Sequence, residues 1–215
     1  MKKKSVAVLG LGKYGKSLAE NLYNMGADVL AVDQDMELVN DFSERCTAAV
    51  CANLTDEDEV ASLGLRNMDI VVTAMGRNLA ASIMSVAVAK EQGVPLVVAK
   101  TSSDRMTSIL HKVGADKILN LEGDGGIRSA RILLSSSFKD FFKLGENLYI
   151  IELKPKKEWI GKSLLELELR RTHSLNIISV RNKEEQWHFV DPKMKLSEDC
   201  SLLVAMEKDT MEKWT

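Results

Sequence analysis

Three glycines near the start of the chain have the spacing of a phosphate-binding loop. Gly10, Gly12 and Gly15 follow the apolar run Val6–Leu9 and precede a helical segment, which gives the pattern G-x-G-x-x-G. The first glycine allows a tight turn, the second lets the backbone approach a phosphate, and the third lets the helix pack closely on the sheet. Free N–H groups at the helix N-terminus attract the anion. This spacing predicts a nucleotide site.

An acid ends the next apolar run, where the ribose of a nucleotide would lie. The run Val29–Val32 leads into Asp33 and Gln34. A carboxylate here accepts hydrogen bonds from ribose hydroxyls and repels a 2′-phosphate, which disfavours an NADP-type ligand. Asp35 is the better candidate for the cap of the following helix, and this leaves Asp33 for the ligand.

Two larger side chains lie inside the glycine loop. Lys13 places a mobile positive charge at the mouth of the loop, and Tyr14 follows it. A cation at this point suits the extended phosphate tail of ADP or ATP. A solvated lysine is the alternative interpretation.

Further candidates follow the later apolar runs. Ligands bind outside the carboxyl ends of parallel strands, so residues at these ends are expected to share one crevice. The candidates are Asn53 and Thr55 after the third run, Ala74, Met75, Gly76 and Asn78 after the fourth, and Lys100 after the fifth. Thr55 with Asp58 also resembles a capping box before Val60, so a structural role for Thr55 stays open.

The apolar runs that carry these candidates predict a doubly wound α/β fold. They are nearly continuous, as in parallel strands that are buried on both faces. Ser103 or Asp104 starts one of the intervening helices, which is expected to stop near Gly114. Alternating strands and helices of this kind form a Rossmann-like sheet. The six expected strands are Val6–Leu9, Val29–Val32, Ala48–Val50, Ile70–Thr73, Leu96–Ala99 and Ile118–Leu121.

The pattern changes in the last third of the chain. Gly123–Gly126 is expected to open a helix from Ile127 to about Phe142, and Leu144–Asn147 is interpreted as a linker. We therefore predict a first domain over 1–143 and a small α+β domain over 144–215. The elements expected in the second domain are strands at Leu148–Leu153, Asn176–Arg181, Gln186–Val190 and Leu202–Met206, a helix at Leu164–Arg170, and a hairpin turn at Lys183–Glu185.

Bulk properties exclude several classes of protein. The net charge is −2 over 215 residues, which does not suggest a nucleic-acid partner. Cys46, Cys51 and Cys200 lack metal-ligand spacing and are interpreted as free thiols in a reducing cytosol. No run has the length of a signal peptide or a membrane span, so we expect a soluble protein that reaches a membrane only through a partner.

These motifs resemble the KtrA/TrkA family, the cytosolic regulatory subunits of bacterial potassium uptake systems, whose fold is called the RCK or KTN domain. The single copy of each domain is more similar to the KtrA-like form than to the doubled TrkA form. The resemblance covers nearly the whole chain and is carried by GLGKYGKSLAENL, VLAVD, CANLTDEDEVASLG, TAMGRNLAAS, GADKILNLE, IGKSLLELELRRTHSLNIISV and DPKMKLSEDCSLLVAM.

The resemblance implies that the first domain binds ATP, ADP or NAD(H) and has no catalytic residues. It also implies dimers that assemble into a ring, typically an octamer, beneath a membrane-embedded potassium-conducting subunit (KtrB/TrkH-like). The protein would then be cytoplasmic and peripheral at the inner face of the membrane, and nucleotide exchange would gate ion flux. By motif, the nucleotide contacts carried over are Gly10, Gly12, Gly15, Asp33, Asn53, Thr55, Asn78 and Lys100.

Two more sites come from the resemblance. Lys13 stands where relatives often carry an arginine that reaches a phosphate, and Glu122 matches an acid that binds a divalent cation in some relatives. In some Gram-positive relatives the second domain binds cyclic di-AMP at its dimer interface. The residues in that region are Arg170, Arg171, His173, Asn176, Ile177 and Pro192, for which a solvated helix end is the alternative.

Two other functions stay open. An NAD-dependent oxidoreductase needs an acid or base that faces the nicotinamide. The three histidines, His111, His173 and His188, are scattered, and the residues after Gly145 show no such constellation. A stand-alone nucleotide or cyclic-dinucleotide sensor that acts on another partner is the third interpretation.

Overall fold

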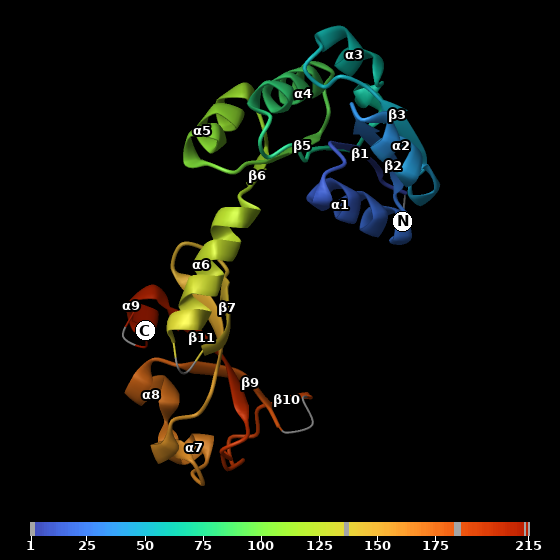
Figure 1. The fold of residues 1–215 in the computed structure, drawn as a ribbon. Coiled ribbons are helices and arrows are strands. Elements are labelled where there is room, and N and C mark those ends of the chain that lie inside the picture. Colours follow the sequence, from blue (N-terminus) through green and yellow to red (C-terminus); the bar gives the residue numbers. More distant parts are fainter. Residues whose placement is uncertain (1–2, 136–137, 183–185, 213, 215) are drawn as a thin grey trace. The chain divides into compact units, whose positions relative to one another are not determined.

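The computed structural model describes residues 3–135, 138–182, 186–212 and 214. The chain divides into two compact units, Met1–Gly123 and Asp124–Thr215. Figure 1 shows the elements of both units. Each unit has its own sheet and its own hydrophobic core, so each is described by itself.

The first unit contains a six-stranded parallel sheet with the order β3-β2-β1-β4-β5-β6. This is the doubly wound arrangement that the alternating pattern predicts, with a switch of winding direction between β1 and β4. All six predicted strands are present, although the last ends at Leu119 because Leu121 already begins a helix. The strands are β1 Ser5–Leu9, β2 Asp28–Asp33, β3 Ala48–Cys51, β4 Ile70–Thr73, β5 Leu96–Lys100 and β6 Lys117–Leu119.

Helices cover both faces of this sheet, and a separate cluster of buried side chains fills each face. Ala7 and Leu9 of β1 belong to the same core as residues of α4 and α5, whereas Val6 and Val8 belong to the same core as residues of α1 and α2. Alternate residues of one strand therefore enter different cores. The elements are α1 Lys13–Asn24, α2 Met36–Phe42, η1 Ser43–Arg45, α3 Glu57–Ser62, η2 Leu65–Asn67, α4 Leu79–Glu91 and α5 Asp104–Val113.

Local capping residues set most of the helix ends in this unit. Asp35 accepts hydrogen bonds from the N–H groups of Glu37 and Leu38 at the start of α2, and Ser103 caps α5, which ends at Gly114, as predicted. The capping box predicted for Thr55 and Asp58 is wrong. Asp56 caps α3 instead and accepts from the N–H of Glu59, because it stands directly before the first helical residue.

The second unit contains an antiparallel sheet with the order β10-β9-β11-β8-β7. One core packs around it and includes Phe138, Ile151 and Trp159. The strands predicted in this region are present within one residue at each end. The elements are β7 Phe138–Lys143, β8 Leu148–Leu153, η3 Lys157–Trp159, α7 Leu164–Leu167, α8 Leu169–His173, β9 Asn176–Arg181, β10 Trp187–Phe189, β11 Ser201–Glu207 and α9 Lys208–Glu212.

The helix predicted from Ile127 to Phe142 is wrong at both ends. Helix α6 spans Leu121–Leu134 and includes the glycine run, and Phe138–Lys143 is strand β7. A register shift between Phe138 and Asp140 adds one residue to the strand, so Phe138 and Phe141 are both buried although they are three residues apart. This bulge reproduces the spacing of an amphipathic helix.

Two other predicted elements take a different form. Leu144–Asn147, interpreted as a linker, is the turn between β7 and β8, and Lys143 pairs with Tyr149 across it. The boundary predicted at 143/144 thus falls inside this hairpin, whereas the two compact units divide at Gly123. The predicted helix at Leu164–Arg170 is two short helices, because Glu168 adopts a φ of 44°. The hairpin turn predicted at Lys183–Glu185 lies outside the described residues.

Asp116 ties three elements of the first unit together, which leads to a stability prediction. Its carboxylate accepts from the N–H of Val97 at 2.7 Å and from Nζ of Lys90 at 3.0 Å. The backbone hydrogen bond from Val97 lowers the pKa of Asp116 below its ordinary value. We expect Asp116→Asn to lower the free energy of unfolding by about 1–2 kcal/mol at pH 7, because one donor loses its partner.

The pH dependence of this effect has a definite sign. A carboxyl group whose pKa is lowered by folding stabilises the fold above its ordinary pKa of about 4, and this contribution disappears as the pH falls through the folded-state value. The difference in stability between wild type and Asp116→Asn should therefore shrink below about pH 4 in urea unfolding experiments. A constant difference from pH 7 to pH 3 would contradict the assignment.

Candidate functional site

The glycine loop is closely packed at two of its three glycines and open at the third. Gly10 has a φ of 103°, and a Cβ added to Gly15 would lie 1.8 Å from the carbonyl oxygen of Gly10. A Cβ added to Gly12 would meet nothing within 4 Å. Gly10 and Gly15 are therefore required by the fold, whereas the fold leaves the space beside Gly12 open.

This open space lies at the N-terminus of α1. Gly12 is the N-cap residue, it provides no side-chain capping bond, and the first turn of the helix contains no acid. Lys13 is exposed, and its side chain forms no ion pair in the described part of the chain. Tyr14 is half-buried, and burial raises the pKa of its hydroxyl. The helix end thus presents N–H groups and a cation to an incoming anion.

Asp33 connects the glycine loop to the end of β2. Its Oδ2 accepts from the N–H of Leu11 at 2.6 Å, and its Oδ1 accepts from the N–H of Asp35 at 3.0 Å. The carboxylate is half-buried. Asp33 therefore has a structural role in holding the loop, and any ribose hydroxyl would share this carboxylate with the two backbone groups.

A pocket of about 130 Å³ lies beside Asp33, where the carboxyl ends of β2, β3 and β4 meet. Four of its lining residues are among the candidates predicted from the sequence, and Leu54 and Ala81 are not. Leu54 lies between two predicted contacts, and Ala81 lies in the first turn of α4, which Asn78 caps through Oδ1. The lining residues are Asp33, Gln34, Leu54, Met75, Asn78 and Ala81.

Asn53 and Thr55 do not line this pocket. Oδ1 of Asn53 accepts from both the N–H and the hydroxyl of Thr55, at 3.1 and 2.7 Å, and the N–H of Asn53 donates to Glu59 at 2.7 Å. These bonds form the turn before α3. Oδ1 of Asn53 and the hydroxyl proton of Thr55 are therefore already used within this turn.

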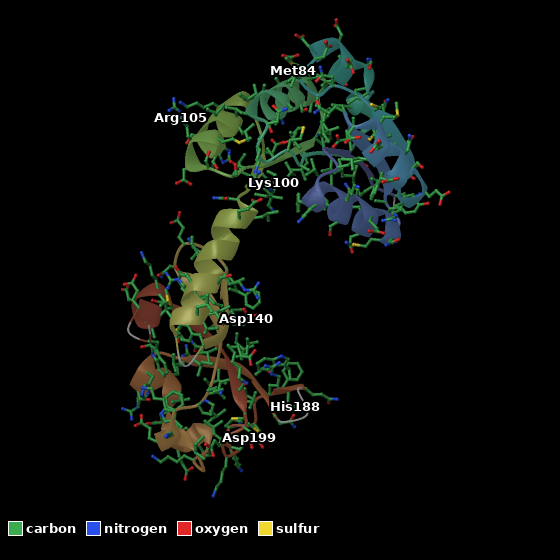
Figure 2. All side chains as sticks on the ribbon, in the orientation of Figure 1. Met84, Lys100, Arg105, Asp140, His188 and Asp199 are labelled. Atoms are coloured by element: carbon green, nitrogen blue, oxygen red, sulfur yellow. The ribbon has the colours of Figure 1, made fainter. Side chains whose placement is uncertain are left out.

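Lys100 and Glu122 form an ion pair within the first unit. Nζ of Lys100, whose side chain is 10% exposed, lies 2.5 Å from Oε1 of Glu122. The hydrogen bond from Lys100 holds the pKa of Glu122 below its usual range, and Arg77 adds to the effect. Figure 2 shows Lys100 near the start of α6. Among the described residues no group of three or more His, Cys, Asp or Glu could hold a metal ion.

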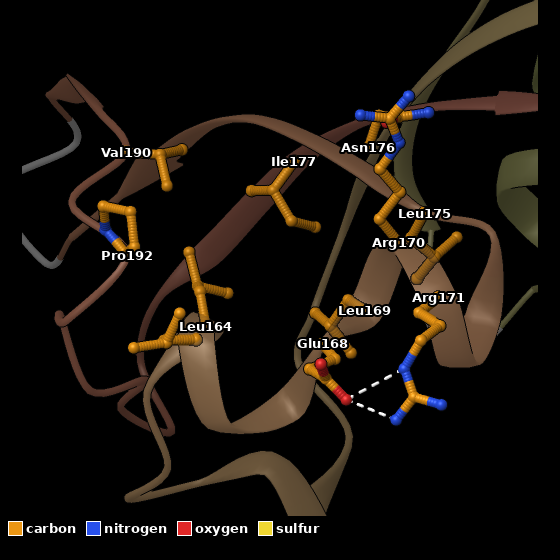
Figure 3. Close-up of a pocket in the computed structure, with 11 residues that line it drawn as sticks. Leu164, Glu168, Leu169, Arg170, Arg171, Leu175, Asn176, Ile177, Val190 and Pro192 are labelled. Atoms are coloured by element: carbon orange, nitrogen blue, oxygen red, sulfur yellow. Dashed lines mark hydrogen bonds and ion pairs between the residues drawn. The ribbon is translucent and has the colours of Figure 1, made fainter.

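A second and larger pocket lies in the second unit. It has a volume of about 430 Å³ and a mainly apolar wall, formed by residues such as Leu164, Ile177 and Pro192. Arginines and an asparagine line it as well (Figure 3). The lining residues are Leu164, Leu165, Glu168, Leu169, Arg170, Arg171, Leu175, Asn176, Ile177, Val190 and Pro192.

Five of the six residues predicted for this region line the pocket, and His173 does not. The His173 ring instead packs edge-on against Trp159, with ring centroids 5.2 Å apart. Nε of Arg171 donates to Glu168 at 2.9 Å, whereas Arg170 has no ion pair among the described residues. Arg170 is therefore the cation of this pocket that is available to an anionic ligand.

Comparison with known proteins identifies the domain family of both units. The family model of the TrkA-N domain matches residues 6–121, and that of the TrkA-C domain matches residues 148–214. Ktr system potassium uptake protein C of Bacillus subtilis is 35% identical over 183 residues, which cover 85% of this chain and 83% of the relative. Ktr system potassium uptake protein A of the same organism is 33% identical over 210 residues, which cover 97% and 95%.

The fold is also found in a solved structure. The GsuK RCK domain superimposes with a TM-score of 0.69 at 16% identity, over 98% of this chain and 46% of the GsuK chain. Fold and domain composition thus define an RCK-type protein with one TrkA-N and one TrkA-C domain. By its sequence identity the chain belongs to the Ktr family of potassium uptake proteins. None of the helices in its described part is both long and apolar enough to traverse a lipid bilayer.

The unequal packing of the glycines predicts unequal effects of substitution. Gly15→Ala should lower the free energy of unfolding by about 3 kcal/mol, because the added methyl group meets the Gly10 carbonyl. Gly12→Ser should leave the free energy of unfolding within about 0.5 kcal/mol of the wild-type value, or raise it, because serine is a favourable N-cap residue. Thermal unfolding without ligand measures both, and equal effects of the two variants would contradict the packing.

Proposed function

We propose that this protein is a nucleotide-sensing regulatory subunit, without catalytic activity, of a membrane potassium uptake system. The observation that carries the proposal is the open N-terminus of α1 beside the Asp33 pocket, in a chain of the Ktr family. Phosphates would lie against the N–H groups at Gly12, and Lys13 would add its charge. The ribose would lie at Asp33 and the base in the pocket that Met75 and Asn78 line.

Such a ligand regulates only if it binds two conformations of the protein with different affinity. ATP, ADP and NAD(H) share the adenosine part and differ in the groups that extend past the α1 N-terminus. We infer that this difference sets the conformation of a homo-oligomeric ring, built from dimers and placed beneath a potassium-conducting membrane subunit. In this assembly the chain is cytoplasmic and peripheral to the membrane.

Nucleotide affinity of a Gly12 variant tests the site. We expect Gly12→Ser to weaken binding of ATP or ADP at least about tenfold, which corresponds to about 1.4 kcal/mol, because the serine hydroxyl occupies the N–H groups and the space that a phosphate needs. Isothermal titration calorimetry on the full chain gives the affinity. Since the fold tolerates this variant, a loss of binding reports on the ligand.

Gly145→Ser is the matched control. Gly145 also has open space around its Cβ position, but it lies in the β7–β8 turn of the second unit. This variant should bind nucleotide as wild type does. Unchanged affinity in Gly12→Ser, or absence of binding of ATP, ADP and NADH to wild type, would refute the proposed site.

We also propose that the larger pocket of the second unit binds a cyclic dinucleotide such as cyclic di-AMP. Its apolar wall suits adenine rings, and Arg170, which has no ion pair in the part of the chain that the structure describes, suits a phosphate. A ligand with two-fold symmetry is suited to two copies of the same pocket in a dimer. This site would give the regulatory subunit a second input that is chemically distinct from the nucleotide of the first unit.

Substitution of Arg170 and substitution of Arg171 should have different effects on the affinity for cyclic di-AMP. Arg170→Gln is expected to weaken cyclic di-AMP binding by tenfold or more, about 1.4 kcal/mol, whereas Arg171→Gln should have a smaller effect because Arg171 is paired with Glu168. Lys157→Gln removes an exposed charge on η3 and serves as the control. Equal affinities of all three variants in calorimetry would exclude Arg170 as the phosphate ligand.

A further inference from the structure

The ion pair between Lys100 and Glu122 joins two parts of the first unit that differ in exposure. Lys100 is the last residue of β5, and its side chain is 10% exposed. Glu122 is the second residue of α6, and its side chain is 61% exposed. If the pair opens, the carboxylate can enter water, whereas the ammonium remains in a largely buried position and needs another anion.

The same ammonium lies directly under the loop that follows β4. A Cβ added to Gly76 would lie 2.7 Å from Nζ of Lys100, and Ser102 donates to the carbonyl oxygen of Gly76 at 2.6 Å. Met75 and Asn78, on either side of Gly76, line the Asp33 pocket. Lys100 therefore stands between Glu122 and the loop that borders the proposed nucleotide crevice.

We propose that Glu122 is a built-in anion that occupies Lys100 while the crevice is empty and that a nucleotide phosphate displaces it. The inference rests on the proposed nucleotide site and adds to it a competition between Glu122 and the phosphate for Lys100. The Lys100 ammonium has three N–H donors, and one of them forms a short charge-assisted hydrogen bond with Glu122 at the start of α6. A phosphate of higher charge at the Gly76 loop competes for that ammonium, and the exposed carboxylate is released to water.

The release of Glu122 would change the first turn of α6. A carboxylate in this turn stabilises the positive end of the helix dipole. The turn is otherwise weak, because Gly123, Gly125 and Gly126 follow within the helix and glycine is a poor helix former. Since α6 begins in the first unit and continues into the second, this pair connects the crevice to the chain segment that leads to the second unit.

A double-mutant cycle on the full chain tests the competition. Glu122→Gln removes the competing charge and should tighten binding of the best-binding adenine nucleotide about threefold to fivefold, as expected for loss of one partly exposed ion pair. In a Lys100→Gln background the same change should have no effect. Calorimetry in buffer with EDTA excludes any contribution from divalent cations.

Two controls keep the cycle interpretable. Glu44→Gln removes an equal charge from η1 and should leave the affinity unchanged. Thermal unfolding without ligand establishes that each variant folds, and if Lys100→Gln does not, Lys100→Arg replaces it and should retain the gain from Glu122→Gln.

The possible outcomes separate the two proposals. Wild-type binding together with unchanged or weaker binding in Glu122→Gln overturns the competition and leaves the nucleotide site in place. A wild type that binds none of ATP, ADP and NADH overturns both.

Discussion

The carbonyl oxygen of Gly10 lies so close to Gly15 that no side chain fits between the glycine loop and α1. This contact fixes the start of the helix against the end of β1. It also directs the free N–H groups of the first turn toward the space beside Gly12, which no side chain of the described residues fills. The proposed phosphate site is thus a consequence of backbone packing, and only the absence of Cβ atoms makes that packing possible.

The charged groups around this space are largely satisfied within the chain. Asp33 holds the N–H groups of Leu11 and Asp35, and Lys100 is paired with Glu122. In the proposed site a ribose hydroxyl would share the Asp33 carboxylate with these backbone groups, whereas a phosphate would displace Glu122 from Lys100. This displacement would link binding to structure, because the ion pair that it replaces joins β5 to α6. Lys13, which has no ion pair among the described residues, would contribute charge without this displacement.

The errors of the sequence interpretation have a common physical origin. Periodicity reports which residues are buried, and it does not report the backbone that buries them. The spacing of Phe138 and Phe141 fits a helix, but a β-bulge buries both residues at the same spacing in β7. Phe142, which follows the same helical pattern, is exposed. Likewise, Leu144–Asn147 has the composition of a linker and also that of a hairpin turn. Only the pairing of β7 with β8 distinguishes the two.

Local patterns were sufficient for the parallel sheet, the glycine loop, the caps at Asp35 and Ser103 and four of the six residues that line the Asp33 pocket. The five predicted residues of the larger pocket, which has eleven lining residues, came from the resemblance to a known family. Continuous apolar runs, glycines at positive φ and short polar caps each depend on a few neighbouring residues, so the sequence alone is enough to predict them. The pairing of Lys100 with Glu122, the packing of His173 against Trp159 and the strand conformation of β7 depend on residues that are distant in sequence or on strand register. Tertiary contacts decide these features, because the same side chain has several possible partners until the fold brings one of them near.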